Sequence, residues 1–99
     1  MRWVALVAIL LIPSACASEP EVPPSVTGLI TSIDRSDRGE ITGFAVEAQG
    51  EGYDLRIDPG RDYGFDLEHL EEHRVQSLPV RVTVQERDGE AYAVEIVDA

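Results

Sequence analysis

The sequence is poor in the residues that build cross-links, thiolate sites and cationic surfaces. A single cysteine among 99 residues excludes an intramolecular disulfide and a metal site made of several thiolates. Only eight residues are basic against 19 acidic ones, and the net charge of −11 argues against non-specific binding to nucleic acid or anionic membranes. There is no G-X-Y repeat and no sustained heptad, so collagen and coiled coils are excluded. The length allows at most one small domain.

The motifs of the common enzyme classes are missing as well. The chain contains no G-x-S-x-G, no P-loop and no Rossmann glycine pattern. The one thiol, Cys16, lies in an N-terminal segment that is expected to be removed or lipidated, so the domain keeps no thiol nucleophile. We therefore expect a protein without catalytic activity.

The first 17 residues differ from everything that follows them. Arg2 is their only charge, and residues 3–12 form an unbroken apolar run of ten. That run is too short for a bilayer core, which takes ~20 residues. A short positive start, a brief apolar stretch and small residues at the end are typical of a signal peptide. A buried N-terminal helix or strand is the weaker alternative, because the apolar residues all precede a run of Ala, Ser and Pro.

Two cleavage sites compete in this segment. Cys16, preceded by the small residues Ser14 and Ala15, resembles the lipobox of bacterial lipoproteins, although Pro13 stands where that family favours Leu, Val or Ile. The resemblance implies cleavage before Cys16 and a lipid on its sulfur. The residues around Cys16 also fit an A-x-A site with cleavage after Ala17, which would release a soluble protein. A lone thiol is rare in a secreted domain, so we favour lipidation of Cys16.

Residues 18–25 read Ser-Glu-Pro-Glu-Val-Pro-Pro-Ser and predict a linker. Three prolines in eight residues prevent helix formation and sheet pairing, so the stretch is expected to be extended and semi-rigid. With a lipid on Cys16, it would hold a folded domain a short distance from the membrane. A disordered tail is the alternative.

Residues 26–99 show the alternation of apolar and polar residues that is typical of strands with one face on a core. Residues 26–34 and 41–48 are strand-like, and Asp88-Gly89 fits a tight hairpin turn near the end of the chain. Residues 49–52 are expected to join the second strand to the third. Three further stretches alternate strictly, with apolar residues at Tyr53, Leu55 and Ile57, at Val80, Val82 and Val84, and at Tyr92, Val94 and Ile96.

One helix signal interrupts the strands. Asp66 is a plausible N-cap for a helix over residues 67–74, in which acidic residues come first and basic residues last. Leu67 and Leu70 would face one side of this helix, together with Leu78 if the helix continues. Pro79 then introduces the next strand.

The order strand-strand-strand-helix-strand-strand resembles the OB-fold, a small Greek-key barrel. The resemblance covers residues 26–99 and implies an all-β domain with one helix and a five-stranded OB-like barrel. A split sheet packed on one helix is the alternative. The stretch 63–73, followed by Pro79-Val80-Arg81-Val82, also resembles small exported proteins of high-GC bacteria, and this resemblance implies no activity.

His69 and His73 are the sharpest functional signal in the domain. Four residues apart, they would share one helix face, and Asp66 lies on the same side one turn earlier. Two imidazoles and a carboxylate suit Zn²⁺ or another borderline divalent metal. The pattern is not the H-E-x-x-H motif, because Leu70 stands in place of the catalytic glutamate. The commoner alternative is a pair of ordinary histidines that complement the end of the helix dipole.

These features predict an exported, non-catalytic binding or accessory module on the outer face of a membrane, which it touches only through a lipid anchor. The acidic surface favours an envelope protein, a peptide or a small cationic ligand as partner. OB domains that bind nucleic acid use a basic groove with exposed aromatics, whereas Tyr53 and Tyr92 are expected to point inward here. The alternatives are a metal-binding protein that uses His69, His73 and Asp66, and a structural spacer without a ligand.

Overall fold

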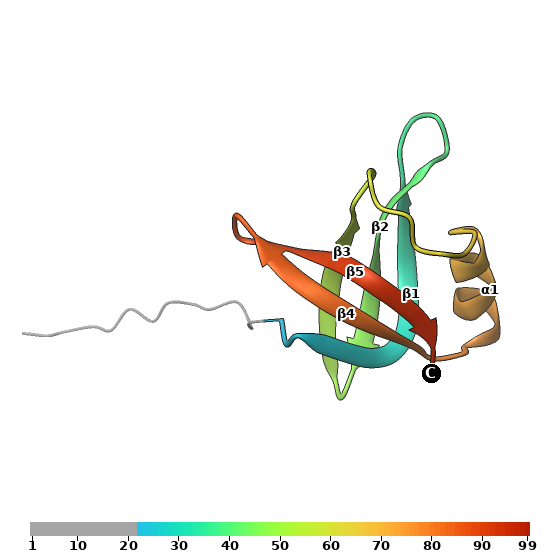
Figure 1. Ribbon diagram of the computed structural model, residues 1–99. Helices are drawn as coiled ribbons and strands as arrows, with labels where there is room; N and C mark the ends of the chain where they lie inside the picture. Colours follow the sequence, from blue (N-terminus) through green and yellow to red (C-terminus); the bar gives the residue numbers. More distant parts are fainter. Residues whose placement is uncertain (1–21) are drawn as a thin grey trace, which may run out of the picture.

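The computed structural model describes residues 22–99, which form five strands and one helix in the expected order (Figure 1). The predicted signal peptide, with Cys16 and both candidate cleavage sites, lies outside the described residues. The elements are β1 (Ser25–Arg35), β2 (Ile41–Ala48), β3 (Glu51–Ile57), α1 (His69–Gln76), β4 (Val80–Arg87) and β5 (Glu90–Asp98). Within residues 22–99 no helix combines the length and apolar character needed to cross a membrane.

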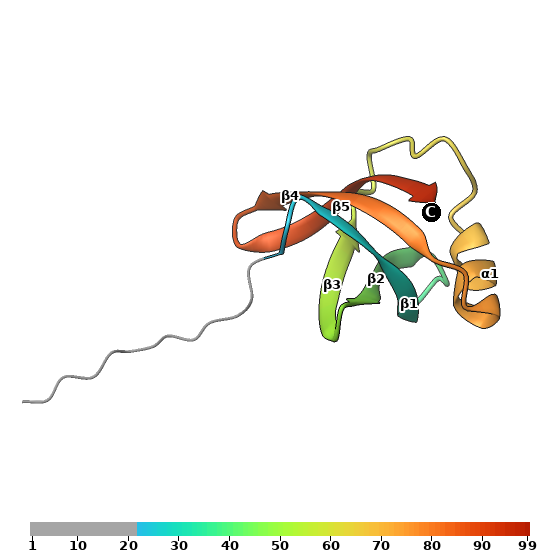
Figure 2. The same cartoon turned by 90° about the horizontal axis from the view of Figure 1, so that it is seen from below.

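The five strands close into a barrel in the order β1-β2-β3-β5-β4. Neighbouring strands are antiparallel except β3 and β5, which run parallel. The barrel closes because β1 serves two partners: its first residues pair with β4 and its later residues with β2. A register shift between Ile30 and Ser32 lies in the second part, and β1 curves strongly around the barrel (Figure 1 and Figure 2). The prediction of an all-β, OB-like five-stranded barrel with one helix is confirmed.

The core fills the inside of the barrel with alternate residues of the strands. Most of the alternating apolar residues of β3 and β4 are buried, and so are Phe44 and Val46 of β2. Helix α1, which lies beside β1, adds the fully buried Leu70 to the same cluster, and Leu67 packs against it as predicted. The apolar residues of the core are Val26, Ile30, Ile41, Phe44, Val46, Leu55, Ile57, Leu70, Val80, Val82, Ala91, Ala93 and Ile96.

Strand β5 does not keep a single alternation along its length. Opposite it, Thr83 of β4 pairs with Glu95 while the next residue, Val84, pairs with Ala93. Val94 is therefore the extra residue of a β-bulge, and the prediction that it points into the core was wrong. A bulge exchanges the inward and outward positions of the strand on its two sides.

The bulge also corrects the prediction for Tyr92. Ala91 and Ala93 are the buried residues before the bulge, and Ile96 is the buried residue after it. Tyr92 faces away from the core, with the Cζ atom of Arg87 4.7 Å from its ring centroid. The long guanidinium side chain thus covers a ring that the strict alternation placed inside.

Both predicted hairpin turns are present. Asp88 and Gly89 have φ angles of 52° and 82°, as a tight two-residue turn requires. Gln49 and Gly50 have φ angles of 56° and 81° and make a second such turn. Because this turn needs only two residues, Gly52 belongs to β3 and not to the connection.

The connection from β3 to α1 is built from aspartate side chains. Asp58, Asp62 and Asp66 each accept, through Oδ1, the backbone N–H two residues further on, at 2.9–3.1 Å. This local bond replaces backbone pairing in a turn. Asp66 therefore caps a turn and not the helix: the N-cap position of α1 is Glu68, which makes no side-chain cap bond. The helix accordingly begins two residues later than predicted.

Helix α1 also ends two residues later than predicted, at Gln76 instead of residue 74. Ser77 is left-handed with a φ of 56°, and the N–H of Leu78 bonds to the carbonyl oxygen of His73 at 3.0 Å. This turn ends the helix at Gln76 and directs the chain into β4. Leu78 is therefore not on the buried side of the helix, and it is 42% exposed.

Candidate metal centre

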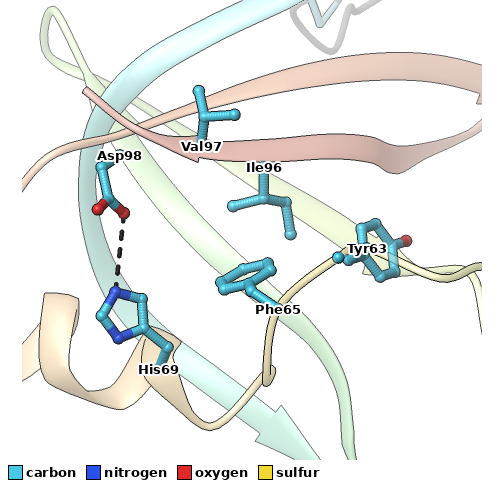
Figure 3. Close-up of a pocket in the computed structure, with 7 residues that line it drawn as sticks. Tyr63, Phe65, His69, Ile96, Val97 and Asp98 are labelled. Carbon is cyan, nitrogen blue, oxygen red and sulfur yellow. Dashed lines mark ion pairs between the residues drawn. The ribbon is translucent and has the colours of Figure 1, made fainter.

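Helix α1 and the end of β5 together form a cluster of metal-ligating side chains. His69 and His73 share one face of the helix, with ring centroids 4.8 Å apart and planes at 83°. Asp98, at the end of β5, lies against both rings, and Figure 3 shows its carboxylate opposite His69. One donor atom from each of the three residues lies within 4.8 Å of the other two.

The structure thus brings the two predicted histidines together but supplies a different carboxylate. Asp66, the residue expected beside them, uses Oδ1 to cap the turn before α1 and lines a separate pocket with Ile41 and Ile57. Asp98 takes its place, although it stands 25 residues beyond His73. Sequence reasoning missed Asp98 because only the pairing of β4 with β5 brings it to the helix.

His73 is held on both ring nitrogens and is 3% exposed. Its Nδ1 lies 3.1 Å from the carbonyl oxygen of Leu78, and its Nε2 lies 2.8 Å from Oδ1 of Asp98. A carbonyl oxygen can only accept, so Nδ1 carries a proton and donates it to Leu78. The turn that ends α1 therefore fixes the ring with Nε2 directed at Asp98.

His69 is held by the same kind of contacts as His73, and it lies at the more open side of the cluster. Its Nδ1 lies 2.8 Å from Oε1 of Glu72, and its Nε2 lies 3.7 Å from the same Oδ1 atom of Asp98. The edge of its ring meets Phe65, with centroids 5.9 Å apart. Glu72 thus accepts from Nδ1 and leaves Nε2 for Asp98.

The two histidines share the arrangement that orients metal ligands. In each, one ring nitrogen is anchored on an acceptor outside the cluster, which fixes the tautomer and presents the other nitrogen to a metal. Neighbouring donors of a tetrahedral zinc centre lie about 3.3 Å apart. The distances of 2.8 and 3.7 Å from the two Nε2 atoms to Asp98 Oδ1 fall on either side of that value. The Asp98 side chain is 73% exposed, so small movements of the carboxylate cost little free energy.

The contact between His73 and Asp98 also requires a proton or a cation between Nε2 and the carboxylate oxygen. A neutral imidazole has one N–H, and in His73 that hydrogen is directed at Leu78. At 2.8 Å, Nε2 and a carboxylate oxygen attract each other only through a second proton or through a bound cation. Two interpretations follow: an ion pair that fastens α1 to β5, and a cation site.

A charge network on the other side of α1 holds the helix in place. Arg35 at the end of β1 contacts Glu68 at 3.0 Å and Glu71 at 3.2 Å, and Arg74 contacts Glu71 at 2.9 Å. Hydrogen bonds from Arg35 lower the pKa of Glu68, and those from Arg74 and Arg35 lower the pKa of Glu71. The contacts of Arg35 tie the start of α1 to β1, so the two histidines stand on a helix that is anchored to the barrel.

The cluster separates two depressions of the surface. One, of about 400 Å³, is lined by residues of the loop before α1 and of β5. The other, of about 270 Å³, is bordered by His73, Leu78 and Pro79. His69 and Asp98 line both, so a cation bound between them would be reached from either side.

Comparisons with known protein families, with curated proteins and with solved structures found no match for this chain.

Proposed function

We propose that this chain is an exported, non-catalytic binding module that holds a divalent transition-metal cation, Zn²⁺ above all. The ligands are Nε2 of His69, Nε2 of His73 and a carboxylate oxygen of Asp98. One observation carries this proposal: both Nε2 atoms are directed at the same carboxylate oxygen while both Nδ1 atoms are bound to acceptors outside the cluster. Two imidazoles and one carboxylate are a borderline donor set that suits Zn²⁺ better than Ca²⁺ or Mg²⁺.

The same donor set gives the metal a defined place in the fold. His69 and His73 come from α1 and Asp98 comes from β5, so a bound cation joins the helix to the end of the barrel. A ligand that binds only the folded state stabilises it, by an amount that grows with the logarithm of the ligand concentration once that exceeds the Kd. The cation is therefore expected to bind with one-to-one stoichiometry and to raise the melting temperature.

The export part of the proposal is supported by the N-terminal sequence. A positive Arg2, a short apolar run and small residues before Cys16 favour a signal peptide with lipidation of that cysteine. Expression in a bacterial host with labelled palmitate tests it, with Cys16→Ser as the control. A labelled, membrane-bound chain supports the lipid anchor, release into the medium of a chain cut after Ala17 supports soluble export, and an uncleaved internal chain contradicts both.

The metal-binding experiment uses the full chain with Cys16→Ser, so that the lone thiol contributes no ligand. Calorimetric titration and thermal shift with Zn²⁺ and Co²⁺ are compared with Asp98→Asn and with His69→Ala. Both positions are partly or largely exposed, so these variants keep the fold while each removes one donor. We expect affinity to fall at least about tenfold in each, since even changes outside the ligand set cost 10–100-fold.

Two control variants make this test specific. Glu95→Gln removes an exposed carboxylate from the same strand as Asp98 and should leave metal affinity unchanged. Asp66→Asn removes the carboxylate that the sequence pattern favoured, and it should also leave the affinity unchanged. No saturable binding, or equal binding by the wild-type chain and Asp98→Asn, would overturn the proposal and leave the cluster as an ion pair between α1 and β5.

A positively charged envelope protein or peptide is a second candidate ligand. The observation that favours it is the net charge of −11, together with exposed Glu47 and Glu51 on the β2–β3 hairpin, which form no ion pair among residues 22–99. Titration with an arginine-rich peptide should then show binding that weakens with salt and that the charge-removing Glu47→Gln/Glu51→Gln variant reduces. Absence of salt-dependent binding would exclude this candidate.

A further inference from the structure

We infer that the cation takes its remaining ligand from the pocket between β5 and the loop before α1, and that this ligand is a small organic carboxylate with an apolar, ring-sized body. The inference rests on the proposed metal function and names the class of molecule that the loaded site binds. It is carried by three features: the number of donors, the lining of the pocket and the charge of the site.

The protein supplies one donor fewer than a zinc ion uses. Zn²⁺ in proteins is almost always four-coordinate, and sites with three protein ligands leave the fourth position to water or to an exogenous ligand. Glu72 does not fill that position, because its Oε1 atom accepts from Nδ1 of His69 at 2.8 Å. The described part of the chain thus leaves one coordination position open.

The pocket beside this position has a polar end and an apolar body. His69 and Asp98 stand at one end, the side chains of Phe65 and Ile96 lie in the middle, and Tyr63 lies at the far end (Figure 3). The depression is open to solvent, and its volume of about 400 Å³ leaves room for a ring-sized body. A ligand bound to the metal at one end would therefore lay a ring-sized body against Phe65.

The charge of the site makes ligand binding depend on the metal. Asp98 is the one anionic ligand of the cation, so the loaded centre keeps a positive charge that attracts a carboxylate. The lining residues include no lysine and no arginine. In the metal-free protein a proton on His73 at most offsets the charge of Asp98, and Glu72 adds a further negative charge, so a carboxylate should not bind.

The experiment titrates phenylacetate and acetate into the full Cys16→Ser chain loaded with Co²⁺, and into the metal-free chain. Visible absorption of Co²⁺ reports the coordination change, and calorimetry reports the affinity. We expect phenylacetate to bind the loaded protein at least about tenfold more tightly than acetate, because its ring buries apolar surface. We expect no binding to the metal-free chain.

Phe65→Ala tests the pocket itself, with Phe65→Leu as a second variant that removes the ring but keeps an apolar side chain if Phe65→Ala fails to fold. Both should reduce the advantage of phenylacetate over acetate and still take up Co²⁺, because Phe65 contacts the His69 ring but supplies no ligand. Leu29→Ala, a change of an exposed apolar residue outside the pocket, is the matched control.

The outcomes separate the two proposals. A Co²⁺ spectrum with no difference between phenylacetate and acetate, or binding of phenylacetate by the metal-free chain, overturns the inference and leaves the metal site intact. Failure of the protein to take up Co²⁺ or Zn²⁺ overturns the proposed function, and the inference with it.

Discussion

Replacing Gly28 with alanine tests how the barrel closes. Gly28 stands in β1 opposite Val80 of β4, one residue before β1 begins to pair with β2. A Cβ atom at this position would overlap the carbonyl oxygen of Glu47 and would lie 3.1 Å from Cγ1 of Val46. The first of these atoms belongs to the backbone, so no rotation of a side chain can relieve the contact.

The size of the effect follows from that overlap. Carbon and carbonyl oxygen approach to about 3.3 Å in close contacts between strands, so β1 and β2 would have to separate by roughly 1 Å. Overpacking of this kind costs about 1–3 kcal/mol, and a backbone contact places this site at the upper end. The smaller entropy of an unfolded chain with alanine returns about 0.4–1 kcal/mol. We expect a net loss of roughly 2 kcal/mol, which lowers the melting temperature by about 8–16 °C.

Scanning calorimetry and urea unfolding would measure this loss. The matched control is Gly52→Ala in β3, where an added Cβ meets no atom within 4 Å. That variant should be neutral or slightly stabilised. Equal melting temperatures for Gly28→Ala and Gly52→Ala would refute the idea that close passage of β1 over β2 requires a glycine.

Three further changes test other parts of the fold. Gly89→Val should destabilise the β4–β5 hairpin by about 1–2 kcal/mol in urea unfolding, because a β-branched residue resists a φ of 82°. Tyr63→Phe should cost about 1–3 kcal/mol in calorimetry, because its hydroxyl donates to the Ala93 carbonyl at 2.6 Å and accepts the Asp58 N–H at 2.9 Å. The lowered pKa values of Glu68 and Glu71 give stability that is fully present above their ordinary value of 4.5 and is lost as pH falls through the lowered values, so Glu68→Gln/Glu71→Gln should flatten the acid limb of a stability–pH curve. Unchanged stability, or an unchanged acid limb, would contradict the contact concerned.

The strands that were predictable from sequence are those whose inner face stays on the core along their whole length. Leu55 and Ile57 of β3, and Val80 and Val82 of β4, are buried as the alternation requires. Burial of one face imposes a period of two on such strands, and a local pattern therefore reports it. The Asp88-Gly89 turn was equally local, since it depends on the φ angles of two adjacent residues.

The start of α1 shows where local patterns are ambiguous. An aspartate before an acidic, leucine-containing stretch is typical of an N-cap, and Asp66 fits that description. The same side chain can bond the N–H two residues on in a turn, which is what Asp58, Asp62 and Asp66 do in series. Both arrangements satisfy one backbone N–H with one carboxylate oxygen, so the sequence alone does not distinguish them.

The candidate site combines a local and a non-local feature. A spacing of four residues brings His69 and His73 to one face of any helix, but Asp98 reaches them through the register of the last hairpin. Counting back from the turn without a bulge pairs Val80 with Val97, whereas the extra residue in β5 pairs Val80 with Asp98. Because β4 starts immediately after the turn that ends α1, the residue opposite Val80 is the one that meets the histidines. A single inserted residue in β5 therefore decides whether a carboxylate or a valine faces the two imidazoles.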